Sequence, residues 1–219
     1  MKNVKRIVAL ILCLMMTVSL CACGAEKNLR GQWECGIDVT ASLTQAVKEN
    51  ADVIADFIEL DGMFATAVFN FSKDGTYKLE FRASDSAAEK FDGAISAGVE
   101  AFVLDYYTQA AEMLNLSLDG MRAMYKNQGM DLDAEMAASV EENLAEINSA
   151  DGEYAGLLDR VLAGYAMSGE WSFSGGTLTL TNGAGNSYEL GISELTKTNL
   201  TVSGSTLEII TAPSVFAKK

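Results

Sequence analysis

Carboxylates at alternate positions are the first candidates for chemistry in this sequence. Asp131, Asp133 and Glu135, with Glu142 further on, place oxygens at positions 1, 3, 5 and 12 of a calcium-binding loop. Such a loop needs glycine at position 6 for its sharp turn, and Met136 stands there. The pattern therefore favours a helix N-terminus, where the macrodipole stabilises negative charge. No metal site is predicted.

Two further pairs of carboxylates suggest acid–base chemistry. Glu141 and Glu142 are adjacent, and Asp56 and Glu59 lie three residues apart. Glycoside hydrolysis needs two carboxylates at a defined distance across a cleft, one with a raised pKa. With 30 acidic residues in the chain, chance pairs are expected. The chain also has no histidine, which excludes Ser-His and Cys-His nucleophiles and most zinc or copper sites. We expect no catalytic residue, no cofactor and no enzyme.

A modified cysteine is the strongest chemical prediction. Lys2, Lys5 and Arg6 precede an uncharged run over residues 7–22, which ends directly before Cys23. A basic start, an apolar run and small residues at the cut are typical of a secretory signal. The run is short for a membrane-spanning helix, although an uncleaved N-terminal anchor is the alternative.

The residues around the cut resemble the lipobox of bacterial lipoproteins. Leu20 lies at −3, Ala22 at −1 and Cys23 at +1, whereas cleavage before Cys21 would leave Leu20 at −1, where a small residue is needed. The resemblance implies a signal peptide over residues 1–22, acyl chains such as palmitate on Cys23, and a tether over 23–28. Two or three chains, at about 0.8 kcal/mol per buried methylene, would anchor the protein to the extracytoplasmic face of the cell membrane.

Charge and cysteine content limit the partners. Without residues 1–22 the chain keeps 13 basic and 30 acidic residues, a net charge of −17. Such a surface repels nucleic acid and anionic headgroups, so nucleic acid is excluded as a partner. Cys35 is the one cysteine left beside Cys23. No intramolecular disulfide is expected, and packing must supply the stability.

The elements that position these residues follow from periodicity. A strand is predicted over 29–35 and a helix over 40–60, with Thr40 or Ser42 as its cap. Strands are predicted over 64–71 and 76–82, because Phe69 and Phe71 flank polar Asn70 and because Tyr77, Leu79 and Phe81 alternate with polar residues. Asp74-Gly75 supplies the turn, which predicts a hairpin. A helical block follows over about 84–166, begun by a capping box from Ser86 to Glu89.

The helical block divides into four predicted helices. The first carries an apolar stripe at spacings of three and four, and the second and third cover residues 117–128 and 133–148. Asp151-Gly152 precedes the fourth. The stripe of the first helix consists of Phe91, Ile95, Val99, Phe102, Tyr106, Ala110 and Met113.

Strands are predicted again after Ser168, because apolar residues there recur at every second position. They are predicted over 170–174, 177–181, 187–192, 199–203 and 206–211, and Val215 and Phe216 close the sheet. The fold class is therefore α+β: an antiparallel barrel or meander with an inserted helical bundle. Residues 29–219 are expected to form one domain with the insertion at about 84–166.

The strand motifs resemble the lipocalin-like small barrels of exported bacterial lipoproteins of unknown function. The resemblance covers about half of the chain after Cys23 and omits the helical block. It rests on Leu29-x-Gly31-x-Trp33, Phe69-x-Phe71-x-x-Asp74-Gly75-x-Tyr77, Trp171-x-Phe173, Gly176-Thr-Leu178-x-Leu180 and Ile192-x-x-Leu195-Thr196-x-x-x-Leu200-x-Val202. In that pattern the tryptophan equivalent to Trp33 closes one end of the barrel, so we expect it in the core.

The functional expectation is a non-enzymatic, membrane-anchored binding lipoprotein. Its ligand would be a small apolar molecule or a peptide, held in the barrel mouth or under the helices. The alternative is a cell-envelope structural or interaction module that meets an envelope protein through its acidic or helical surface. The methionines of the helical block are expected in a helical core, with an adaptable apolar groove as the alternative. Possible ligand-wall residues are Phe69, Phe71, Tyr77, Phe81 and Trp171.

Overall fold

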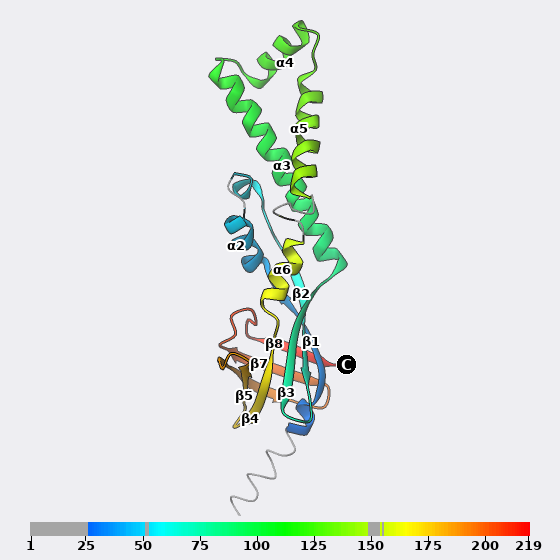
Figure 1. Cartoon of the computed structure of the whole chain (residues 1–219), viewed down its shortest axis with the longest axis vertical. Coiled ribbons are helices and arrows are strands. Elements are labelled where there is room, and N and C mark those ends of the chain that lie inside the picture. Colours follow the sequence, from blue (N-terminus) through cyan, green and yellow to red (C-terminus); the bar gives the residue numbers. More distant parts are fainter. Residues whose placement is uncertain (1–25, 51–52, 149–153, 155) are drawn as a thin grey trace, which may run out of the picture. The chain divides into compact units, whose positions relative to one another are not determined.

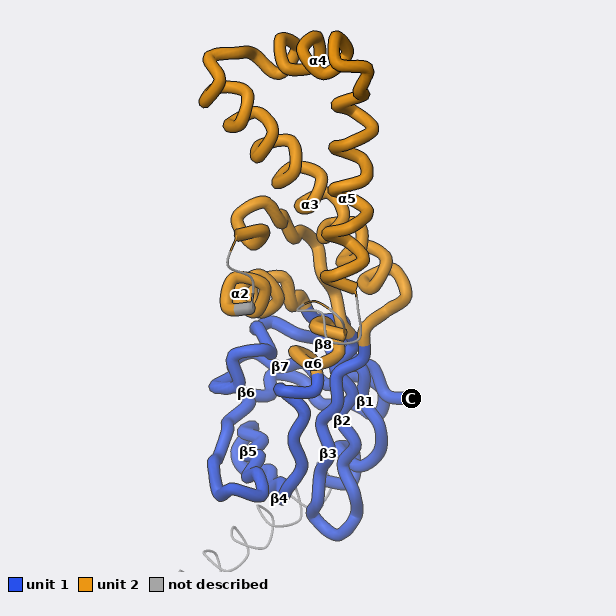
Figure 2. The backbone as a smooth tube through the Cα atoms, turned by 45° about the horizontal axis from the view of Figure 1, so that its top comes forward, with its two compact units in different colours: residues 1–37, 66–82, 163–219 blue, residues 38–65, 83–162 orange. Residues whose placement is uncertain are grey.

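A computed structural model describes residues 26–50, 53–148, 154 and 156–219. The predicted signal peptide, Cys23 and the Asp151-Gly152 break lie outside these residues. The chain forms two compact units, coloured separately in Figure 2. Unit 1 comprises residues 1–37, 66–82 and 163–219, and unit 2 comprises 38–65 and 83–162. No helix in the described part of the chain is long and apolar enough to cross a bilayer.

Eight antiparallel strands close into a barrel in chain order, which confirms the predicted α+β fold with a β-barrel (Figure 1). The first and last strands pair, with Trp33 opposite Lys218, and this pairing closes the sheet. The strands are β1 (Gly31–Asp38), β2 (Phe64–Phe71), β3 (Thr76–Ala83), β4 (Met167–Ser174), β5 (Thr177–Asn182), β6 (Ser187–Leu195), β7 (Asn199–Ser205) and β8 (Ser214–Lys218).

The predicted hairpin between β2 and β3 is confirmed. The Asp74 carboxylate accepts hydrogen bonds from the Thr76 amide at 3.1 Å and the Thr76 hydroxyl at 2.7 Å. Gly75 takes φ +84°, a left-handed conformation that glycine adopts without a steric penalty. The local sequence thus sets both the turn and the register of the two strands.

Alternate residues of each strand point into the barrel and form its core. Trp33, as predicted, is 0 % exposed, and its indole Nε1 donates to the Leu29 carbonyl at 2.6 Å. Residues 26–29 form a helical turn, so β1 begins at Gly31 and not at Leu29 as predicted. The other large apolar side chains that are fully buried in the strands are Phe69, Phe71, Leu79, Leu178, Leu180, Leu190, Leu200 and Phe216.

Unit 2 is built from two connections of the barrel. The first, between β1 and β2, holds α2 (Thr40–Asn50) and the 3-10 turn η1 (Ala55–Phe57). The second, between β3 and β4, holds α3 (Asp85–Met113), α4 (Leu118–Asn127), α5 (Leu132–Ile147) and α6 (Leu157–Gly164). The helices predicted between residues 84 and 166 are therefore present, and the preceding connection joins them in unit 2.

The first helix begins at Thr40 as predicted, but the predicted caps of two helices were wrong. Ser84, not Ser86, caps α3, because its hydroxyl accepts from the Ala87 amide at 3.1 Å. Thr40 does not cap α2. Its own amide donates to the Asp38 carboxylate at 2.9 Å, and its hydroxyl accepts from the Met63 amide at 2.9 Å.

Two predicted elements are shorter or absent. The helix predicted over 40–60 is helical to Asn50, and Ala55–Phe57 form a 3-10 turn. The strand predicted over 206–211 is a loop, in which the Ser205 hydroxyl accepts from the Leu207 amide at 3.0 Å and the Ile210 amide donates to the Leu207 carbonyl at 2.9 Å. These turn contacts occupy backbone groups that a ladder would use, while Leu207 and Ile210 remain buried.

Candidate functional site

Three of the five predicted ligand-wall residues, Phe69, Phe71 and Trp171, lie together as an aromatic cluster. Phe69 stacks on Phe71 with ring centroids 5.2 Å apart, and Phe71 meets Trp171 edge-on at 5.5 Å. Phe81 contacts Tyr165 at 6.3 Å. Offset and edge-to-face pairs of this kind stabilise a core beyond their buried area.

Burial shows how much room these side chains leave. Phe69 is 0 % exposed and Phe71 is 1 % exposed. A side chain with no accessible surface borders no space that a water molecule could enter, so the barrel is filled around the ring of Phe69. Their role as a ligand wall stays a prediction, and a ligand there would have to displace packed aromatics.

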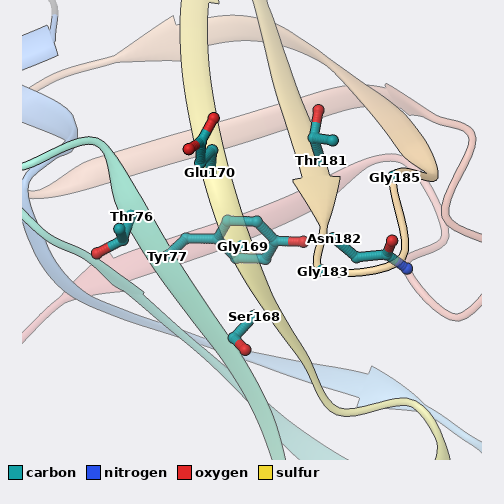
Figure 3. A pocket seen from close by; sticks show the side chains of 9 residues that line it. All are labelled: Thr76, Tyr77, Ser168, Gly169, Glu170, Thr181, Asn182, Gly183 and Gly185. Atoms are coloured by element: carbon teal, nitrogen blue, oxygen red, sulfur yellow. The ribbon is translucent and has the colours of Figure 1, made fainter.

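Tyr77 lies beside an open pocket of about 660 Å³ on β3, β4 and β5 (Figure 3). It stands opposite Gly169, and its ring reaches across that glycine toward Asn182. Tyr77 is 3 % exposed, and its hydroxyl has no hydrogen-bond partner among the described residues. Burial, and next the phenol of Tyr188, raise the pKa of Tyr77, so it stays a neutral phenol.

The rest of this pocket is polar but lacks a catalytic pair. Glu170 lies between Thr76 on β3 and Thr181 on β5 in the register. Among the described residues it is the one carboxylate that lines the pocket. Acid–base hydrolysis of a glycoside needs two carboxylates. The arrangement therefore offers hydrogen bonds to a polar molecule, and no pair for acid–base hydrolysis stands among the lining residues.

The carboxylates singled out from the sequence lie in unit 2. The Asp131 carboxylate accepts from the amides of Asp133 and Ala134 at 3.0 and 3.3 Å, which confirms it as a helix N-cap. Arg122 bridges Asp119 and Asp133. Within the described residues no three ligating side chains lie close enough to hold a metal ion. The other five carboxylates, Asp56, Glu59, Glu135, Glu141 and Glu142, are all exposed.

The apolar stripe of α3 changes character along the helix. Phe91, Ile95 and Val99 are at most 4 % exposed, as a packed stripe requires. Tyr106 and Met113 continue the stripe but are 61 % and 79 % exposed. The far part of the helix therefore presents uncovered apolar side chains.

The apolar side chains of α5 and α4 are also only partly buried. On α5, Met136, Val140 and Leu144 are only half-buried. A small core of Ala111, Met121 and Leu132 joins α3, α4 and α5. The predicted methionine core is thus confirmed for Met121, whereas Met113 and Met130 are exposed. Periodicity could identify the stripe but not how much of it is covered.

Charge is divided unevenly between the units. Counted from Cys23, unit 1 carries eight acidic and eight basic residues and is neutral. Unit 2 carries 22 acidic and five basic residues, so it holds the whole net charge of −17. The sequence showed an acidic protein, but only the assignment of residues to units shows that the helices are the acidic part.

No family model, curated protein or solved structure matches this chain.

Proposed function

We propose that this chain is a lipid-anchored extracytoplasmic binding protein whose helical unit holds a basic, apolar segment of a partner protein. The observation that carries the proposal is the uncovered end of the α3 stripe, where Tyr106 and Met113 are 61 % and 79 % exposed. Exposed apolar side chains on one stripe of a helix suit the apolar face of a partner helix. Methionines adapt to varied partner shapes.

Charge selects among the possible occupants. Unit 2 has 17 more acidic than basic residues, so a second copy of the same helices would be repelled. A segment with lysine or arginine beside its apolar residues would instead be attracted and oriented. Nucleic acid is disfavoured for the same reason as a second copy. A basic amphipathic helix satisfies both the apolar stripe and the acidic surroundings.

A small apolar ligand inside the barrel has less support. Phe69 leaves no space beside it, and the open pocket near Tyr77 is lined by polar side chains and glycines. We also propose that the chain is related to the lipocalin-like exported lipoproteins, which the closed barrel and the strand motifs support. In this interpretation the barrel is a packed support that the lipid on Cys23 holds at the membrane surface.

Peptide binding tests the proposed partner. The probe is a fluorescein-labelled amphipathic helix of about 20 residues made of leucine and lysine, with a leucine–glutamate version as the matched peptide. Fluorescence anisotropy with the chain carrying Tyr106→Ser and Met113→Ser should show at least about tenfold weaker binding, roughly 1.4 kcal/mol. Val215→Ser is the control, because Val215 is a 56 % exposed apolar residue of the barrel.

The outcomes separate clearly. Binding of the lysine peptide that the double variant loses and the control keeps supports the proposal. Equal binding of both peptides, or equal loss in both variants, contradicts it. The anchor is tested separately by Cys23→Ser, which should release the protein from the membrane fraction and remove metabolically incorporated palmitate.

A further inference from the structure

A second pocket lies at the end of the barrel where the chain enters β1. It has a volume of about 570 Å³. It is formed by the start of β1 and the β2–β3 turn, two segments of unit 1. Its lining residues are Arg30, Gly31, Phe71, Ser72, Lys73 and Asp74.

Two cations in this pocket lack counter-ions. Within the described residues neither Arg30 nor Lys73 forms an ion pair, whereas Lys78, Arg82, Arg122 and Lys219 do. The Nε of Arg30 is buried and has no hydrogen-bond partner in the part of the chain that the structure describes. A buried donor on a charged group is costly unless something accepts from it, so an anion is the natural complement.

The pocket's own carboxylate is already engaged. Asp74 accepts from the amide and the hydroxyl of Thr76 at 3.1 and 2.7 Å, which holds it in the turn. Phe71 supplies an apolar wall, and Gly31 supplies no side chain. The pocket therefore combines two cations with an apolar surface, as an amphipathic anion requires. Arginine binds phosphate oxygens through two parallel N–H groups.

The chain length places this pocket close to the predicted anchor. Arg30 follows Cys23 by seven residues. Even fully extended, seven residues span about 25 Å, and residues 26–29 form a helical turn that shortens the path. If Cys23 is lipidated, Arg30 cannot lie farther than this from the acyl chains. Lipid phosphates are then the anions present at the highest local concentration.

We infer that Arg30 and Lys73 form a binding site for the phosphate of an anionic phospholipid beside the protein's own lipid anchor. The membrane as the source of this phosphate rests on the lipidation proposed above, but the site is independent of the helical unit. The net charge of −17 argues against anionic membranes for the whole chain, yet unit 1, which holds this pocket, is neutral. The site would give the barrel a preferred contact with the bilayer.

Native mass spectrometry of the full lipoprotein in neutral detergent tests the site. The probes are phosphatidylglycerol, phosphatidylcholine and inorganic phosphate, each added separately. Phosphatidylglycerol should bind in preference to phosphatidylcholine. The Arg30→Gln, Lys73→Gln variant should bind it at least about tenfold more weakly. Arg82→Gln with Lys197→Gln removes the same number of charges from the barrel elsewhere and should leave binding unchanged.

Two further measurements distinguish loss of binding from loss of folding, and the comparison of probes identifies the source of the phosphate. Arg30→Lys with Lys73→Arg keeps both charges and should retain phosphatidylglycerol binding, and the melting temperature of each variant checks the fold. Equal phosphatidylglycerol binding in the Gln variant and the wild type overturns the site. Binding of inorganic phosphate without phosphatidylglycerol overturns the lipid assignment, and so does equal binding of both lipids.

Discussion

Lys218 lies over the indole ring of Trp33, with its Nζ 5.0 Å from the ring centroid. The same Nζ donates a hydrogen bond of 2.8 Å to the carbonyl of Asn28. The two residues are also register partners in the pairing of β1 with β8. The closure of the barrel is therefore made by side chains as well as by the backbone ladder.

Replacement of this lysine should weaken the closure. Lys218→Met keeps most of the apolar stem but removes the cation–π contact and the hydrogen bond to Asn28. We expect a loss of about 1–2 kcal/mol in the free energy of unfolding, measured by urea denaturation. Lys197→Met is the control, since Lys197 is an exposed lysine outside this contact. Equal stability of the two variants would show that the contact contributes nothing.

Gly169 should tolerate no side chain. A Cβ atom there would lie 1.9 Å from the carbonyl oxygen of Thr181, a backbone atom that cannot move aside. Gly169→Ala should therefore cost about 3 kcal/mol or more, or prevent folding. Gly183→Ala, with nothing within 4 Å of its Cβ, should change the unfolding midpoint little. Wild-type stability of Gly169→Ala would refute the close approach of the two strands.

The predictable part of the fold was the part with local causes. The β2–β3 hairpin followed from alternation and the Asp74-Gly75 turn, and its first strand has the predicted bounds 64–71. The first residue of a helix was harder to predict, because several neighbouring hydroxyl groups can cap the same helix. For α3, Ser86 was predicted as the cap and Ser84 is the observed one. The strand predicted over residues 206–211 was wrong because alternating apolar residues indicate only that their side chains are buried. The side chains of a loop can be buried in the same alternating way as those of a strand.

The candidate sites depend on contacts distant in sequence. The apolar stripe of α3 runs without a break from Phe91 to Met113, but only its first part is buried. Burial depends on which other segments pack against the helix. The pocket of Arg30 and Lys73 joins residues 43 positions apart through the pairing of strands. Neither the extent of burial along α3 nor the pocket can be predicted from the periodicity of a single segment.

Two glycines of α3 should respond to alanine with opposite signs. A Cβ at Gly98 would meet Cγ1 of Ile58 at 2.6 Å and the carbonyl of Phe57 at 3.2 Å, whereas Gly93 faces open space. Gly93→Ala should stabilise by about 0.5–1 kcal/mol through helix propensity. Gly98→Ala should destabilise by about 1–3 kcal/mol. Thermal unfolding followed by circular dichroism gives both signs, and stabilisation by both would disprove the contact of α3 with η1.

Cys35 should react slowly in the folded protein. Burial, the main effect, raises the pKa of its thiol, and hydrogen bonds with Val215 and Ser214 lower it less. Since the thiolate is the reactive form, a chain with Cys13, Cys21 and Cys23 all replaced by serine should react with a disulfide reagent more slowly folded than in urea at pH 8. Its pH–rate midpoint should lie above that of the unfolded chain. A midpoint shifted downward would contradict the burial of the thiol.

The turn at Asp74 should lose stability in acid. The Thr76 hydroxyl, and next the Thr76 amide, lower the pKa of the Asp74 carboxyl below its ordinary 3.8. A carboxyl whose pKa is lower in the folded state stabilises the fold above its unfolded pKa. That contribution disappears as the pH falls through the folded value.

Thr76→Val removes the hydroxyl and keeps the branched shape, so the pKa of Asp74 should rise toward 3.8. Carbon-detected NMR titration measures it. Asp38 serves as the internal control, because Thr40 lowers its pKa independently. A rise at both carboxyls, or at neither, would show that the Thr76 hydroxyl does not set the value.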